Sequence, residues 1–252
     1  MISDYVELRT RSAFSFLEGA STPEDLAARA AELGYGALAL GDRDGLYGAP
    51  RFHQAAKDAG IKPMVGAELT LSDESRLYVC LAGGPTSPLS RMVVRGEDPR
   101  PLCERLRALF GAGNLFIDLQ RHLDANEERL NRKLAALAAA CRVPLVASND
   151  VCHGGADRQL LDVLTCIRLG TTLEEAGRRL WSNNQRHLKP SAEMAALFRD
   201  LPGAVAAPRA LAGRCAFTPA DMGYRFPDYP LPPRETPDSY LGSLQKTEYK
   251  AR

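Results

Sequence analysis

Short apolar runs alternate with segments of helical spacing along most of the chain. Short apolar runs bounded by Gly, Pro, Asn or Asp predict buried strands, and apolar residues spaced three and four apart predict amphipathic helices. On this basis we expect strands near residue 6 and over 36–40, 62–71, 77–81, 114–119 and 143–147. We expect helices over 23–33, 49–59, 98–110, 126–140, 190–200 and 204–215, with further helical segments from 157 onward, one of them capped by Thr172.

This alternation predicts an α/β fold with a parallel sheet covered by helices, either open or closed into a barrel. A chain of 252 residues is long enough to bury one large core. Residues 224–237 hold five prolines and three aromatic residues, which is typical of an extended arm.

Charge and cysteine content narrow the possible functions. Lys plus Arg total 32 and Asp plus Glu 31, so a net charge of +1 gives no electrostatic case for bulk binding to nucleic acid or membranes. The six cysteines form no C-x-x-C pair, which indicates reduced thiols. We find no signal-like segment and no apolar run of membrane-spanning length, and we expect a cytoplasmic protein.

Polar side chains stand at or just past the ends of several predicted strands. Because the carboxyl ends of parallel barrel strands meet at one mouth, we expect such residues to gather into a site. In chain order they are Arg9, Arg11, Glu18, Asp42, Arg43, Glu68, His122, Asp150, Cys152 and His153.

Arg9 and Arg11 are separated by one position at the end of the first strand. The strand period of two puts both side chains on one face, about 7 Å apart. Histidines so placed would be two convergent metal ligands, but a guanidinium stays protonated and offers no lone pair. Taken alone, the pair reads more readily as surface charge on an edge strand.

The other candidates also have simpler interpretations. Asp42 and Asp150 follow strands, where an acidic residue is as often a helix N-cap as a functional group. His122 could lie in a solvated loop, and Cys152 is more often a small buried hydrophobe than a ligand. The residues alone therefore suggest a site without fixing its chemistry.

Several stretches resemble the PHP (polymerase and histidinol phosphatase) domain of bacterial class C DNA polymerases, the DNA polymerase III alpha subunits, and above all their error-prone, damage-tolerant branch. They include Y-V-E-L-R-T-R-S-A-F-S-F-L-E-G-A-S, G-I-K-P-M-V-G-A-E-L, V-P-L-V-A-S-N-D-V and E-T-P-D-S-Y-L. The resemblance implies a distorted seven-stranded, TIM-like α/β barrel, the seventh strand coming from the C-terminal half. It also implies a PHP domain over 1–223 and a proline-rich arm over 224–252 leading toward a polymerase palm. The stretch between Leu71 and Leu77 looks shortened relative to the family.

The resemblance also implies the trinuclear site for zinc, manganese or iron that PHP domains have. The positions of its metal ligands can therefore be matched to residues of this chain. Arg9 and Arg11 stand where the family has its first two histidines, Arg43 replaces the histidine of a T-D-H motif after Asp42, and Cys152 replaces the last histidine. The remaining matches, to acidic or histidine ligands, are Glu18, Glu68, His122 and Asp150. One further ligand would fall in the shortened stretch.

Three imidazoles have thus become three fixed cations, which can neutralise carboxylates but cannot lower the pKa of water. We therefore expect a non-catalytic, structural module with an arginine–carboxylate network and no cofactor. We expect this module to support a polymerase core and to reach DNA only through that core. The arginines could also hold phosphate or sulfate. The alternative is a metal-dependent phosphoesterase or 3′–5′ exonuclease with zinc or manganese on a reduced site of Glu68, His122, Asp150, Cys152 and His153. A weaker third possibility is an anion-binding module unrelated to polymerisation.

Overall fold

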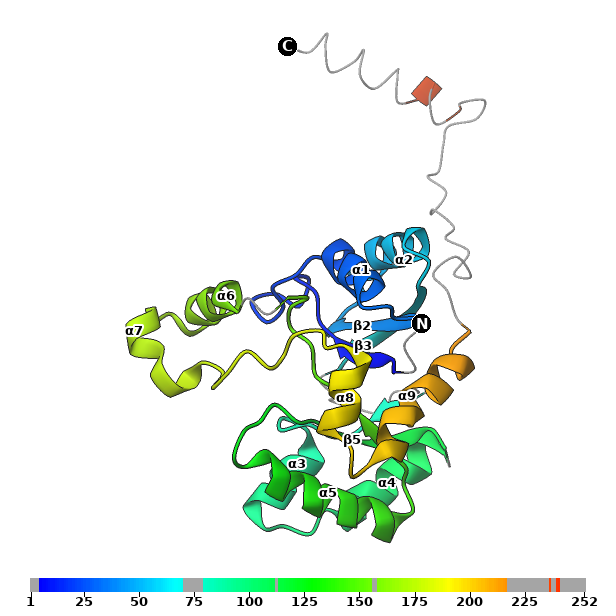
Figure 1. Ribbon diagram of the computed structural model, residues 1–252, viewed down its shortest axis with the longest axis vertical. Coiled ribbons are helices and arrows are strands. Elements are labelled where there is room, and N and C mark those ends of the chain that lie inside the picture. Colours follow the sequence, from blue (N-terminus) through cyan, green and yellow to red (C-terminus); the bar gives the residue numbers. More distant parts are fainter. Residues whose placement is uncertain are drawn as a thin grey trace. The chain divides into compact units, whose positions relative to one another are not determined.

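The computed structural model describes residues 5–69, 79–111, 113–155, 158–216, 236 and 239–240 (Figure 1). The chain divides into two compact units, Met1–Pro219 and Ala220–Arg252. The first unit is a mixed α/β fold with parallel strands. The predicted boundary between residues 223 and 224, and nearly all of the predicted arm, lie outside the described residues.

Among the described residues, six short strands form two parallel sheets. The first sheet has the order β1 (Glu7–Thr10), β2 (Ala37–Arg43), β3 (Lys62–Glu68), and the second has the order β4 (Cys80–Leu81), β5 (Leu115–Leu119), β6 (Leu145–Ala147). The predicted strands are therefore all present among the described residues, with ends shifted by up to three residues. Residues 77 and 78 of the expected 77–81 strand, like the shortened stretch, fall outside them.

An isolated parallel bridge connects the end of β1 to the segment that follows β6. It pairs Thr10 with Val151, and the Arg11 N–H donates to the Val151 carbonyl at 2.8 Å. A second parallel bridge pairs His153 with His187. Within the described ranges these strands and bridges do not close into a barrel, so the seven-stranded barrel stays a prediction.

Helices lie between most successive strands, as in other α/β folds, and further helices follow the last of these strands (Figure 1). They are α1 (Pro23–Glu32), α2 (Ala49–Asp58), α3 (Pro88–Arg95), α4 (Arg100–Phe110), α5 (Glu127–Cys141), α6 (Gln159–Leu169), α7 (Leu173–Ala176), α8 (Ser191–Leu197) and α9 (Pro202–Arg214). A 3₁₀ turn over Gly177–Arg179 follows α7. The expected cap of α1 is present, because the Thr22 hydroxyl accepts from the Asp25 N–H and Pro23 occupies the first turn.

The sequence pattern missed helix α3. Its start lies in G-G-P-T-S-P, which reads as a turn, yet the Ser87 hydroxyl accepts from the Ser90 N–H and Pro88 occupies the first turn. Leu89 and Val93 are buried, so packing of this one face stabilises the helix.

The main core lies between the sheets and the helices that cover them. It contains buried residues from both the strands and the helices, among them Leu26, Leu38, Leu40, Phe52, Leu115, Ile117, Leu119 and Leu134. This core packs on one face of β2 through Leu38 and Leu40, while Ala37 and Ala39 on the other face belong to a smaller cluster with Met64 and Ala212.

Candidate functional site

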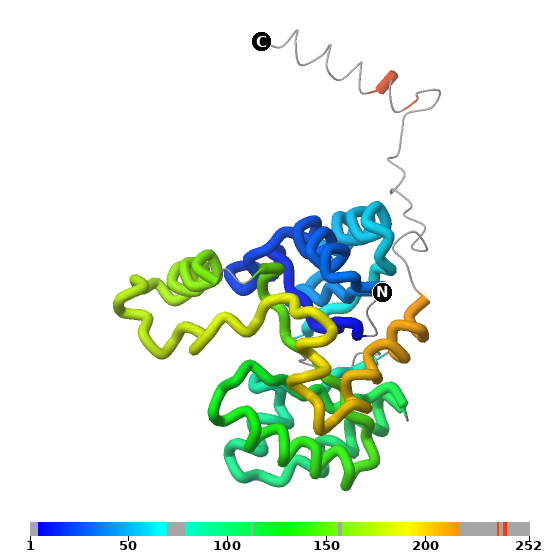
Figure 2. The backbone as a smooth tube through the Cα atoms, in the orientation of Figure 1, coloured from blue at the N-terminus to red at the C-terminus, as the bar shows by residue number. Residues whose placement is uncertain are grey.

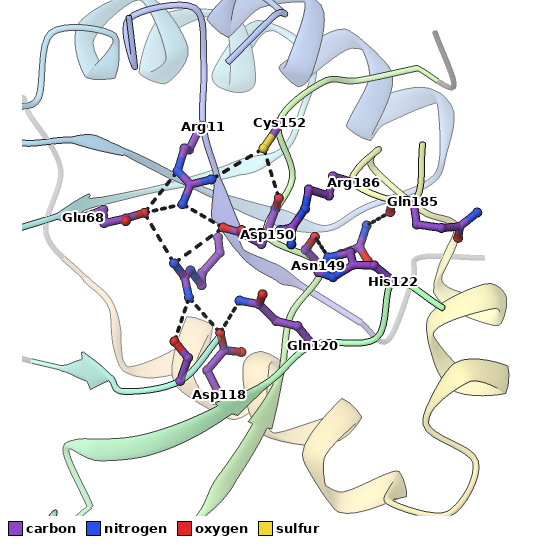
Figure 3. A network of polar contacts seen from close by, with 12 residues as sticks. Arg11, Glu68, Asp118, Gln120, His122, Asn149, Asp150, Cys152, Gln185 and Arg186 are labelled. Atoms are coloured by element: carbon purple, nitrogen blue, oxygen red, sulfur yellow. Dashed lines mark hydrogen bonds and ion pairs between the residues drawn. The ribbon is translucent and has the colours of Figure 1, made fainter. Parts of the chain in front are cut away.

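Arg9 and Arg11 point to the same side of β1, as the period of two predicts. Both reach the same oxygen of Glu68, the last residue of β3 (Figure 3). The distances to Glu68 Oε2 are 3.4 Å from Arg9 Nη2, 2.5 Å from Arg11 Nη2 and 3.1 Å from Arg11 Nε. The two arginines and Glu68 therefore form one contact group at the ends of neighbouring strands.

Asp150 adds a second carboxylate from the segment after β6. Its Oδ1 lies 3.0 Å from Arg11 Nη2 and 3.5 Å from Arg9 Nη2, and its Oδ2 accepts from Arg186 Nη1. Burial alone would raise the pKa of Asp150, but the guanidiniums of Arg11, Arg9 and Arg186 outweigh it and hold the pKa well below its usual range. Asp150 also has a φ of +47°, a left-handed conformation that is uncommon outside glycine and recurs at functional sites.

Asp118, in the middle of β5, supplies the third carboxylate. Arg9 Nη1 donates to Asp118 Oδ2 at 3.1 Å, and Gln120 Nε2 donates to the same oxygen at 2.9 Å. Asp118 is fully buried, and this burial raises its pKa in spite of Arg9. A Cβ on Gly83 would lie 1.9 Å from the Asp118 carbonyl oxygen, so only glycine lets the end of β4 come this close.

These residues form one group, which we call the arginine–carboxylate cluster: Arg9, Arg11, Arg186, Glu68, Asp118 and Asp150. Three fixed cations face three carboxylates that come from β3, β5 and the segment after β6 (Figure 3). At such short separations the carboxylates would repel one another strongly without the arginines. Removing one member would leave a buried charge without its partner.

Arg43 and Glu18 do not join this cluster, contrary to the prediction that Arg43 shares a pocket with Glu68 and Asp150. Arg43 Nη1 pairs with Glu18 Oε1, and the Arg43 side chain is 44% exposed. Strand alternation does not explain this, because Arg43 pairs with Glu68 in the parallel register of β2 and β3 and therefore starts from the same face of the sheet. Its long side chain instead turns to Glu18 in the loop after β1.

Asp42 holds the loop after β1, and it is not the N-cap of α2, where Gly48 stands. Its Oδ1 accepts from the Ser12 N–H at 2.7 Å and from the Ser15 hydroxyl at 2.8 Å. This buried carboxylate therefore anchors the chain that leaves β1.

His122 and Cys152 lie close to the cluster with their polar atoms already engaged. The His122 ring lies 2.6 Å from Glu127 Oε1 through Nδ1 and 2.8 Å from the Asn149 carbonyl oxygen through Nε2. The Cys152 sulfur lies 3.5 Å from Arg11 Nη1, and burial raises the pKa of this thiol despite Arg11. Neither an imidazole with two partners nor a neutral thiol is ready to bind a metal ion.

His153 is buried after β6, and its ring centre lies 6.2 Å from that of His187 at a tilt of 35°. It therefore packs beside the returning segment that carries His187. Across the described ranges, no group of three or more His, Cys, Asp or Glu side chains converges as metal ligands would.

Comparison of the sequence with known proteins shows what this chain is similar to. Residues 7–82 match the model of the PHP domain. The chain is a PHP-domain relative of the error-prone DNA polymerases. It is 39% identical to the error-prone DNA polymerase of Anaeromyxobacter dehalogenans (strain 2CP-C) over 274 residues, which cover 91% of this chain and 24% of that protein. It is 34% identical to the enzyme of the same name from Mycolicibacterium paratuberculosis, over 98% of this chain and 28% of that protein.

The chain thus spans about a quarter of the length of the curated relatives it matches. The PHP match includes β1 to β3 and with them Arg9, Arg11 and Glu68. The alignment with the Anaeromyxobacter relative is longer than this chain of 252 residues, so that relative has positions that this chain lacks.

Two members of the cluster, Asp118 and Arg186, were not predicted from the sequence. Asp118 had a signal, because a lone acidic residue inside the otherwise apolar L-F-I-D-L run must be buried and partnered. Arg186 had none, since it lies in a polar loop with no periodicity, and only the return of the chain brings it to Asp150.

The described helices include none long and apolar enough to cross a membrane.

Proposed function

We propose that this chain is the PHP module of an error-prone DNA polymerase of the DNA polymerase III alpha type, and that the module is structural and not catalytic. The observation that carries the proposal is the position of the Arg9 and Arg11 guanidiniums, which contact Glu68 and Asp150 directly. In this proposal the arginine–carboxylate cluster takes the place of a metal site.

The residues of the cluster do not fit a metal-ion centre. A guanidinium has five N–H donors and no lone pair, so it cannot coordinate a metal, and its positive charge competes with one. The carboxylate oxygens that metals would bind already accept from arginines, as at Glu68 Oε2 and Asp150 Oδ2. A hydroxide nucleophile at neutral pH requires a metal that lowers the pKa of water, and the arginines cannot supply this.

The cluster can still connect separate parts of the chain. Through its ion pairs, β1 contacts β3, β5 and the segment after β6, while Arg186 connects the returning loop to Asp150. Charge pairs that are mostly buried fix geometry more surely than they add stability. A module of this kind would keep the strand ends in place for a neighbouring polymerase core, as part of replication or damage-tolerant synthesis.

We also propose that the fold is the distorted seven-stranded barrel, with its seventh strand near His187. The bridges Thr10–Val151 and His153–His187 support this order, since they continue the parallel pairing beyond β6. The proposed PHP domain covers residues 1–223, followed by an arm over 224–252.

Calorimetric titration of the purified chain with zinc and with manganese tests the proposal, together with phosphoesterase assays before and after chelation. We expect no tight binding and a melting temperature that hardly changes in excess metal, because a ligand stabilises only a protein that binds it. The matched variant is Arg9→His/Arg11→His, which restores imidazoles at the two family positions and should bind metal more tightly than the unchanged chain. Two or more tightly bound metals in the unchanged chain, with hydrolysis that a chelator abolishes, would refute the structural role.

A further inference from the structure

A long excursion leaves the strand ends and returns to them. It comprises residues 154–186, of which 156 and 157 lie outside the described set, and it carries α6 and α7. Its two ends are held together, because the Cys152 N–H donates to the Arg186 carbonyl at 2.9 Å and the Leu188 N–H donates to the His153 carbonyl at 3.2 Å. Figures 1 and 2 show α6 and α7 projecting from the rest of the fold and the chain running back beside its starting point.

Helix α6 is apolar on the side that faces solvent. Leu160, Val163 and Ile167 are 53%, 42% and 61% exposed, and their spacing of three and four puts them on one face of the helix. Other positions of the same helix, such as Leu161 and Cys166, are buried. A single exposed leucine needs no explanation, but a row of three on one helix face marks an interaction surface. We call Leu160, Val163 and Ile167 the α6 stripe.

Charged residues of both signs follow the stripe along the chain, at the end of α6, in α7 (Glu174 and Glu175) and after it. Arg168 lies 3.6 Å from Glu18 Oε1, and Arg178 and Arg179 are exposed in the turn after α7. An apolar centre with a charged rim is the usual composition of a protein–protein interface.

We infer that the α6 stripe is the docking surface for the polymerase part of an error-prone DNA polymerase, the three quarters of such a protein that this chain does not match. This inference rests on the proposed function. The chain covers 24% of its Anaeromyxobacter relative, so most of such a protein lies outside the present fold and needs a surface to pack on. That alignment covers 91% of this chain, and because α6 is far from both ends it lies within the aligned stretch.

The stripe is also connected to the arginine–carboxylate cluster. The Arg186 guanidinium carbon lies 3.8 Å from the centre of the Trp181 ring, and the same guanidinium pairs with Asp150. Trp181 belongs to the excursion and is 39% exposed. The cluster therefore fixes the base of the excursion, and through it the place at which α6 is presented to a partner.

The test compares α6 in two proteins: the purified 252-residue chain, and the Anaeromyxobacter dehalogenans polymerase with its aligned stretch replaced by this chain. Hydrogen exchange of the α6 amides is measured in both. Docking should slow exchange in the chimera by roughly tenfold or more, because covered helices open less often. The variant Val163→Gln/Ile167→Gln should lose this slowing and should leave the melting temperature of the isolated chain almost unchanged.

The matched control is Val94→Gln/Leu109→Gln, which removes two apolar side chains, 76% and 51% exposed, from α3 and α4. This control should keep the slow exchange of α6 in the chimera. Equal exchange rates in chimera and isolated chain, or a chimera that fails to fold with the unchanged chain, would overturn the inference. The inference would also be overturned if the isolated chain formed a dimer and Val163→Gln/Ile167→Gln abolished that dimer. Metal binding by the isolated chain would contradict only the proposed function, so the two failures can be told apart.

Discussion

Replacing Arg11 with alanine should lower the free energy of unfolding by about 2–4 kcal/mol at pH 7. Arg11 donates to Glu68 through both Nε and Nη2 and lies 3.0 Å from Asp150 Oδ1. Breaking a buried ion pair from one side costs about 3–5 kcal/mol, because the carboxylate left behind stays desolvated. The lower range applies here, since the Glu68 side chain is 26% exposed and Arg9 still contacts both acids.

Urea unfolding followed by circular dichroism measures this loss, and the slope of the transition shows whether the variant unfolds in the same two-state manner. The control is Arg100→Ala, which removes a bidentate pair with Asp98 at the surface. Both of these side chains are about half exposed or more, so the control should change the stability by less than about 1 kcal/mol.

The pH dependence of the Arg11→Ala effect has a definite sign. The folded state lowers the pKa of Asp150, so the stabilisation from its ion pairs is present above the ordinary carboxyl pKa near 4 and is lost as the pH falls below it. The difference between Arg11→Ala and the unchanged chain should therefore be larger at pH 7 than at pH 3. A loss at pH 7 no greater than that of Arg100→Ala would show that the cluster is not a coupled, buried charge network.

Three further predictions concern other parts of the chain. Burial raises the pKa of Glu7 to about 7. The stabilisation from this raised pKa is present below about pH 4.5 and should fall by up to about 3 kcal/mol as the pH rises through 7. Unfolding titrations at several pH values should show this slope, and Glu7→Gln should lose it. Arg186→Ala should change the emission of Trp181, the single tryptophan, because the stacked guanidinium is removed, which steady-state fluorescence detects. With a net charge of +1, the isolated chain should bind a single-stranded DNA oligonucleotide only weakly at roughly 200 mM salt; sub-micromolar binding in fluorescence anisotropy would contradict this.

Local sequence signals predicted the elements whose causes are themselves local. The start of α1 followed from Thr22 and Pro23, and the buried strands β2 and β5 followed from short apolar runs. Helix α3 was missed because a proline after serine reads as a turn when the burial of its apolar face is unknown. The pairing of the segment after β6 with β1 could not be predicted, since it joins residues far apart in the sequence.

The site was predictable where strand geometry alone decides it. Alternation along β1 and the shared end of a parallel sheet suggested that Arg9, Arg11, Glu68 and Asp150 lie together, and the family resemblance supported that grouping over surface charge; the ion pairs now join these four residues. Arg43 was assigned to the same pocket from its matching position in the family, and it pairs with Glu68 in the sheet, yet its guanidinium pairs with Glu18. Family position and strand register both put Arg43 beside Glu68, but neither shows which carboxylate its long, half-exposed side chain reaches.

The geometry of the cluster explains why arginine, and not a neutral residue or lysine, suits these positions. The carboxylates of Glu68, Asp118 and Asp150 come from three different chain segments and need positive charge between them. The guanidinium of Arg9 reaches all three, and it also donates to the Gly83 carbonyl. A planar fork with five donors can contact several acceptors at once, whereas the lysine ammonium is a compact point charge. Arginine can therefore hold the strand ends at fixed separations, as a bridging metal would, while bringing none of the metal's reactivity.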